Sequence, residues 1–240
     1  MCHLRIALVV CLGALALSGC GRSPAPAVRT PDSAPLIALP PAPLLSVAGY
    51  KLILDYEVGG GAPYYNKLLS RPTWPGEESG VTVGVGYDCG YNSRAVILGD
   101  WSEVRQAARL AAASGVTGPP AKARAAELRD ILIAWGLAEE VFNRVTVTRF
   151  YQLAQRTYPG FDGLRPNAQA ALVSLTFNRG SSMTGDRRAE MREIRDCVPR
   201  RDYAGMARAN RASIRVWRGT SIETGMARRR EAEARLMETP

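Results

Sequence analysis

The sequence is short of histidine, and this shortage excludes several kinds of catalytic site. Its one histidine, His3, lies in an N-terminal segment with the pattern of an export signal. Removal of that segment leaves no histidine, which excludes a Ser-His-Asp triad, a Cys-His pair and a His-ligated zinc site. Any chemistry must then depend mainly on carboxylates, hydroxyls, tyrosine, lysine or arginine.

Long hydrophobic runs are absent apart from one at the N-terminus. Arg5 precedes an apolar run from Ile6 to Leu17, which is too short to span a bilayer as a stable helix. The run ends in Leu-Ser-Gly-Cys20, which resembles a bacterial lipobox, where the cysteine is lipidated and the chain is cut before it. We expect residues 1–19 to be a lipoprotein signal peptide and Cys20 to be the membrane anchor. An ordinary secretory peptide is the alternative.

Cysteine is also scarce once the signal peptide is removed. Cys2 and Cys11 leave with it and Cys20 is lipidated, so only Cys89 and Cys197 remain. Two cysteines far apart in the sequence do not form a metal site. Export to an oxidising compartment makes a Cys89–Cys197 disulfide one interpretation, and two separate thiols are the other.

Proline marks the division of the chain. Residues 21–43 contain seven prolines, which predicts an extended tether over residues 20–43. We expect one globular domain over residues 44–240, because 240 residues with 46% hydrophobic content suffice for one sizeable core. No internal repeat is present.

The charge is strongly positive and comes mostly from arginine. The formal net charge is +9 and the isoelectric point is about 9.7. Such a balance suits a polyanion: nucleic acid, an anionic membrane surface or an acidic cell-wall polymer. No nucleic-acid-binding motif is present and most arginines alternate with Glu or Asp, so we do not expect nucleic acid as a partner.

The first globular element is predicted to be an amphipathic helix that starts near Leu44 and stops at Gly59-Gly60-Gly61. Glu57 falls in its last turn, where the helix dipole disfavours a charged carboxylate. An exposed glutamate that tolerates this cost and a carboxylic acid held ready to donate a proton both fit that position.

Residues 79–90 combine valine, glycine and two polar side chains. Valines alternate with Thr or Gly, which is the period of a half-buried strand. Two glycines in a strand indicate that something approaches the backbone closely, although a glycine-rich hairpin is an equal alternative. One face of the strand would carry Thr82, Gly84, Gly86 and Asp88.

The remainder reads as a loop and a series of helices. Aromatic and proline residues between 62 and 76 predict a loop that either stacks on sugars or packs internally. Helices are predicted at 101–114, 119–135, 139–158, 166–179, 187–198, 202–212 and 222–237.

Several segments, in chain order, carry a family resemblance. They are Glu57 with Val-Gly-Gly-Gly, Tyr-Asn-Lys at 65–67, Thr-Trp-Pro-Gly at 73–76, Gly-Val-Thr-Val-Gly-Val-Gly-Tyr-Asp at 80–88, Ala-Ala-Leu-Val-Ser-Leu-Thr-Phe-Asn-Arg-Gly at 170–180, and Gly-Met-Ala-Arg-Arg-Arg-Glu-Ala-Glu-Ala-Arg-Leu at 225–236. Together they resemble the muramidase domain of pesticin-like proteins, which are relatives of the phage-type lysozymes of glycoside hydrolase family 24.

The resemblance implies an α+β lysozyme-like fold, with a mainly helical body, a small β-hairpin or sheet lobe and an active-site cleft between them. It implies Glu57 as general acid, with Thr82 and Asp88 positioning a water. Cys89 departs from the family, where that position is often apolar. We also expect substrate contacts from Tyr65, Gly84, Gly86, Tyr87 and Asn178.

The expected function is therefore that of a peptidoglycan hydrolase, a muramidase that cleaves the β-1,4 bond between N-acetylmuramic acid and N-acetylglucosamine with inversion. The alternatives are a lytic transglycosylase that uses Glu57 alone and a non-catalytic peptidoglycan-binding lipoprotein. We expect a monomer without metal or organic cofactor. Gly21 after the lipidated cysteine favours the outer membrane, facing the periplasm, if the host is Gram-negative; secretion is the alternative.

Overall fold

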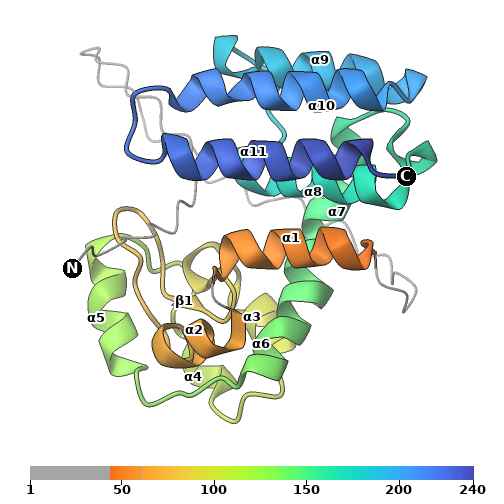
Figure 1. The fold of residues 1–240 in the computed structure, drawn as a ribbon. Helices are drawn as coiled ribbons and strands as arrows, with labels where there is room; N and C mark the ends of the chain where they lie inside the picture. Colours follow the sequence, from red (N-terminus) through yellow and green to blue (C-terminus); the bar gives the residue numbers. More distant parts are fainter. Residues whose placement is uncertain (1–43, 60) are drawn as a thin grey trace, which may run out of the picture.

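The computed structural model describes residues 44–59 and 61–240. The predicted signal peptide, the anchor Cys20 and the proline-rich tether lie outside the described residues. Helices α8–α11 form the upper part of the molecule in Figure 1, and a lower lobe contains the only sheet among the described residues. The protein is thus mainly helical with one small antiparallel sheet, compatible with the predicted α+β class.

Helix α1 (Val47–Glu57) lies between these two parts (Figure 1). It begins at Ser46, whose hydroxyl accepts a hydrogen bond from the Gly49 N–H at 3.1 Å. Gly49 lets the helix pack against α8, because a Cβ at this position would lie 2.0 Å from the Cβ of Ala170. The prediction that Glu57 lies in the last turn of the first helix is confirmed, and the helix ends just before the predicted glycines.

The lower lobe is built from short elements. Trp101, which is fully buried, lies at the centre of their packing and contacts the aromatic ring of Tyr87 edge-on. Its elements are α2 (Gly61–Leu68), β1 (Thr82–Val83), β2 (Tyr87–Asp88), the 3-10 turn η1 (Cys89–Tyr91), α3 (Arg94–Asp100), α4 (Ala107–Ala111) and α5 (Pro119–Glu127).

The glycine-valine stretch forms a hairpin rather than one half-buried strand. Strands β1 and β2 pair antiparallel, and Gly84 and Gly86 lie in the turn with φ of +59° and +71°. The core surrounds this hairpin: Val81, Val83 and Val85 are buried, and so are Thr82 and Gly84 between them, so the alternation does not mark one buried and one exposed face. The hairpin that the sequence offered as one interpretation is present, and close approach of a ligand to its backbone stays a prediction.

A continuous helical stretch of residues 135–157 connects the lower lobe to the upper part (Figure 1, green). It consists of α6 (Trp135–Val141), a π-helical segment η2 (Phe142–Val147) and α7 (Thr148–Thr157). Its end before Pro159-Gly160 agrees with the prediction. Gly136 does not end a preceding helix as predicted; it lies in the first turn of α6.

The upper part is a layered bundle in which most of α8 is buried. Helix α8 packs against α1, α7 and α11, while α10 packs against both α9 and α11. Its elements are η3 (Phe161–Gly163), α8 (Pro166–Arg179), η4 (Asp186–Arg188), α9 (Ala189–Cys197), η5 (Val198–Arg200), α10 (Tyr203–Ala212), η6 (Ser213–Trp217) and α11 (Glu223–Glu238).

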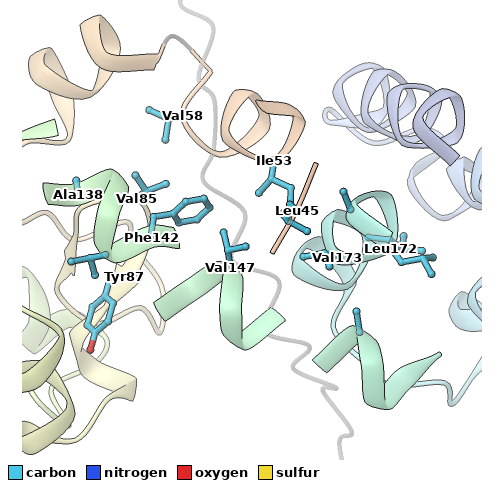
Figure 2. Close-up of a cluster of buried hydrophobic side chains, with 14 of the residues drawn as sticks. Leu45, Ile53, Val58, Val85, Tyr87, Ala138, Phe142, Val147, Leu172 and Val173 are labelled. Carbon is cyan, nitrogen blue, oxygen red and sulfur yellow. The ribbon is translucent and has the colours of Figure 1, made fainter. Parts of the chain in front are cut away.

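One hydrophobic core runs through both parts. Figure 2 shows Ile53 of α1 between Phe142 of the connecting helix and Val173 of α8, all of them buried. None of the described helices combines the length and the apolar character that a membrane crossing requires.

Several predictions for the lower lobe are wrong. The aromatic segment after Gly61 is helix α2 rather than a loop. Asp100 ends α3 instead of starting a helix, because Ser93 caps α3 earlier in the chain through its hydroxyl, which accepts from the Val96 N–H. The predicted single helix at 101–114 is interrupted by turns before α4.

The Cys89–Cys197 disulfide is not formed, because the two thiols belong to different parts of the molecule. Cys89 is buried in η1 of the lower lobe, and Cys197 ends α9, at the top of Figure 1. Burial raises the pKa of the Cys89 thiol to about 12, so this cysteine acts as a small apolar core residue. That role accounts for a cysteine where the resembled family often has an apolar residue.

The hairpin turn yields a stability prediction. An alanine at Gly84 would combine a left-handed backbone with a Cβ 2.6 Å from the ring of Trp101, whereas at Gly86 no atom lies within 4 Å. Gly86→Ala should therefore cost about 1–2 kcal/mol of unfolding free energy. Gly84→Ala should cost about 1–3 kcal/mol more, because the core is overpacked. Urea denaturation measures both, and equal losses would contradict the role given to Trp101.

Candidate functional site

Glu57 lies at the junction of the two parts of the molecule. It is the last residue of α1, its side chain is 14% exposed, and the next residue, Val58, is fully buried. The helix thus ends by directing a carboxyl group into a confined position with a small opening to solvent.

Arg229 of α11 holds this carboxyl group. Its Nη1 donates to Oε1 of Glu57 at 2.9 Å, and its guanidinium lies 5.3 Å from the ring centre of Tyr56. The Arg229 side chain is only 6% exposed, so water does not screen the pair as it would a surface ion pair. Glu57 and Arg229 therefore link the first and last helices of the described chain.

A second carboxylate lies behind Arg229. Glu233 is completely buried, and its Oε1 accepts from Arg229 Nε at 3.2 Å and from Arg230 Nη2 at 2.9 Å. The Ser174 hydroxyl donates to the same oxygen at 2.6 Å. Burial lowers the pKa of Arg230 to about 10, so Arg230 remains charged at neutral pH. Glu57, Arg229, Glu233 and Arg230 form one buried chain of alternating charge, which we call the ion network.

Burial raises the pKa of Glu57 above its ordinary range. The charge and hydrogen bond of Arg229 oppose this rise, and the charge of Glu233 adds to it. The sequence pointed to the helix dipole as the cause of such a rise, but in the structure loss of solvent is the largest cause. A carboxyl group in this position can hold a proton closer to neutral pH than an exposed glutamate.

Thr82 and Asp88 face each other across the hairpin. They are direct partners in the antiparallel register of β1 and β2, so their side chains lie on the same side of the sheet. Thr82 is buried, and its hydroxyl has one weak contact, with the Gly80 carbonyl at 3.5 Å. Thr82 and Asp88 thus share one face as predicted, but they lie on two paired strands and not along one strand.

Asp88 is held by the backbone. Its Oδ2 accepts from the Gly80 N–H at 2.9 Å and its Oδ1 from the Gly90 N–H at 2.8 Å. Burial raises the pKa of Asp88, while these donors oppose the rise by favouring the charged form. Each carboxylate oxygen keeps a second lone pair that can orient a water molecule.

The hairpin lies next to the end of α1. Val58 and Val85 belong to the same buried cluster, and Figure 2 shows them near each other beside Phe142. Figure 1 also places β1 below the end of α1. No hydrogen bond or ion pair between described residues joins Glu57 directly to Thr82 or Asp88.

Three of the residues predicted to contact substrate are buried in the structure. Tyr65 is fully buried and its hydroxyl donates to the Ile133 carbonyl at 3.0 Å, so it cannot stack on a sugar. Tyr87 is buried and donates to Asp100 Oδ2 at 2.7 Å. Gly84 is needed by the packing of Trp101.

Two predicted contacts remain predictions. Gly86 is exposed, and no neighbouring atom blocks its approach. Asn178, in the last turn of α8, is half-buried, and its Oδ1 accepts from Arg230 Nη2 at 3.2 Å. Asn178 is therefore an outer member of the ion network.

Sequence reasoning missed the roles of Arg229 and Glu233. Both lie in the Arg-Arg-Arg-Glu-Ala-Glu stretch already quoted for the family resemblance. Their spacing of four residues puts an arginine and a glutamate on one helix face, which is the available signal. The sequence contains no signal that this face is buried against Glu57.

Neither a surface groove nor a metal-binding cluster among the described residues involves the predicted site residues. A groove of about 630 Å³ runs along α1 and α11, with Leu52, Ala232 and Leu236 among its lining residues, and none of the predicted site residues lines it. Within residues 44–59 and 61–240, no three His, Cys, Asp or Glu side chains gather closely enough to hold a metal ion.

Comparison with known proteins finds no relative of this chain. The chain matches no family in a scan against known protein families, and a search of curated proteins finds no match either.

The raised pKa of Glu57 predicts how stability depends on pH. The folded protein binds this proton more tightly than the unfolded chain does, where the ordinary value is 4.5. The stability that the proton contributes is fully present below pH 4.5 and is lost as the pH rises through the folded-state pKa. Between pH 4.5 and the folded-state pKa, the unfolding free energy of the wild type should therefore fall relative to that of Glu57→Gln.

Denaturant titrations of both proteins at a series of pH values measure this difference. Asp55→Asn is the matched control, because Asp55 is exposed on the same helix and should change stability by less than about 0.5 kcal/mol. A difference between wild type and Glu57→Gln that stays constant with pH would contradict the raised pKa.

Proposed function

We propose that this protein is a peptidoglycan hydrolase with a lysozyme-like fold that cleaves the β-1,4 bond between N-acetylmuramic acid and N-acetylglucosamine. The observation that carries the proposal is Glu57, a largely buried carboxyl group of raised pKa beside a hairpin in which Thr82 faces Asp88. The family resemblance adds the substrate class. The net charge of +9 suits an anionic polymer.

The reaction follows from the charge that develops during bond cleavage. A glycosidic oxygen leaves only when it is protonated, and Glu57 supplies that proton. Asp88 stabilises the developing oxocarbenium ion as a carboxylate and, with the Thr82 hydroxyl, orients a water on the opposite face of the sugar. Attack by that water inverts the anomeric carbon. The proposed substrate cleft lies between the end of α1 and the hairpin.

A lipid anchor at Cys20 and the tether of residues 20–43 would place the domain in the cell envelope, facing the periplasm from the outer membrane. This location, secretion as its alternative, and a monomeric state stay predictions. They are compatible with peptidoglycan as the substrate, which lies within reach of a tethered domain.

A set of three variants tests the roles of the site residues. Glu57→Gln keeps the shape but removes the acid, so turnover of purified peptidoglycan should fall by about 10²–10⁴. Asp88→Asn should abolish most turnover, and Thr82→Ala should leave partial activity because a hydroxyl only assists. Release of soluble muropeptides measures all three, with Asp55→Asn as control.

The pattern separates the proposed function from its alternatives. A lytic transglycosylase would tolerate Asp88→Asn, and a non-catalytic binding protein would show no turnover in the wild type. Asp88 also ties the hairpin together, so circular dichroism must show that Asp88→Asn is folded before its activity is compared. Hydrolysis by Glu57→Gln at the wild-type rate would refute the assignment.

A further inference from the structure

Glu233 is a carboxylate that cannot touch substrate and yet has an unusually complete set of partners. It is fully buried and receives hydrogen bonds from residues of α8, α10 and α11. Besides Ser174, Arg229 and Arg230 on Oε1, Asn210 donates to its Oε2 at 3.2 Å. A buried carboxylate with four donors has a fixed position.

Arg229 is fixed in turn at every nitrogen. Nε donates to Glu233, Nη1 donates to Glu57, and Nη2 donates to the carbonyl and hydroxyl oxygens of Ser174 at 3.2 Å each. This guanidinium therefore has no other orientation available. Its charge is divided between two carboxylates, one buried and one facing the proposed cleft.

This division affects Glu57. An arginine paired with one carboxylate alone favours the charged form of that carboxylate and removes its usefulness as an acid. A second carboxylate on the same guanidinium weakens that effect. The charge of Glu233 does act in this direction, since it raises the pKa of Glu57.

We propose that Glu233 is a positioning residue: it fixes the guanidinium of Arg229 and shares its charge, so that Arg229 orients Glu57 without depriving it of its proton. The inference rests on the proposed function of Glu57 as proton donor.

The other groups near Glu57 do not replace Glu233. Helix α8 carries one charged residue, Arg179, which donates to the Arg187 carbonyl. On α1, Tyr56 lies beside Arg229, and the pair of Lys51 with Asp55 is exposed. On α11, Arg230 is bound to Glu233 itself, and Arg228 is exposed. Asp88, on the hairpin, has no hydrogen bond to Glu57.

Two substitutions should move Glu57 in opposite directions. In Glu233→Gln, the charge of Arg229 is paired with Glu57 alone, so the pKa of Glu57 should fall. Arg230→Met removes the competing cation, so Glu233 offsets more of the charge of Arg229 and the pKa of Glu57 should rise. Glu231→Gln is the matched control: Glu231 lies two residues from Glu233 on α11, pairs with Arg211 and Arg235 outside the ion network, and should leave Glu57 unchanged.

The measurement is a carbon-13 NMR titration of the glutamate carboxyl groups in the full chain, with the Glu57 signal assigned by its loss in Glu57→Gln. The basic limb of the pH profile for peptidoglycan cleavage should move with the NMR midpoint of Glu57. At pH values above that midpoint, lowering the pKa of Glu57 by one unit should lower the rate about tenfold, because less of Glu57 is protonated. A purely structural role for Glu233 would lower activity equally at every pH.

The outcomes keep the two claims separate. A Glu57 midpoint that stays unchanged in Glu233→Gln, or that moves the same way in both variants, overturns the role of Glu233. If Glu233→Gln does not fold, Arg230→Met decides alone, since Glu233 keeps three of its four partners there. A chain that never cleaves peptidoglycan refutes the proposed function, while the NMR shifts would still report on Glu233.

Discussion

The hydrogen-bonded pair of Glu57 and Arg229 is the contact on which the rest of the site depends. It joins residues 172 positions apart in the sequence, at the end of the first described helix and within the last. Both side chains are largely buried, so the pair exists only when α1, α8 and α11 have packed together. Breaking one side of such a pair typically costs about 3–5 kcal/mol, because a buried charge is left without its partner. Arg229 avoids this cost on loss of Glu57, since Glu233 remains bound to it.

The hairpin supplies the other half of the proposed site by a different physical means. Its strands have two residues each and could not hold a position alone. Its valines are buried in the core, and Trp101 packs where Gly84 has no side chain. The Asp88 carboxylate accepts hydrogen bonds from two backbone N–H groups. The proposed proton donor and the proposed water-positioning pair thus come from two separately stabilised parts. They lie near each other where Figure 2 shows Val58 beside Val85, both in the buried cluster.

Much of the fold follows from local sequence signals. Pro166 and Gly180 bound α8, α10 begins beside Asp202, and Glu57 lies in the last turn of α1 before a run of glycines, all as predicted. The errors arise where tertiary packing overrides local pattern. Tyr65 has the sequence context of a loop aromatic but lies in a helix, where it is buried against Trp135. The valine alternation comes from a hairpin inside the core.

The acids Glu57 and Asp88 could be selected from sequence, whereas the ion network could not. Nothing in the local sequence indicates that Arg229 of α11 faces α1.

The central claim is that Glu57 donates a proton while a water attacks the sugar. Mass spectrometry of muropeptides released from purified peptidoglycan by the full chain tests it most directly. Hydrolysis by a positioned water predicts products that end in reducing N-acetylmuramic acid. Products with 1,6-anhydro ends would show that no water attacks and that Asp88 and Thr82 have no part in the chemistry. The absence of released muropeptides would contradict the account entirely.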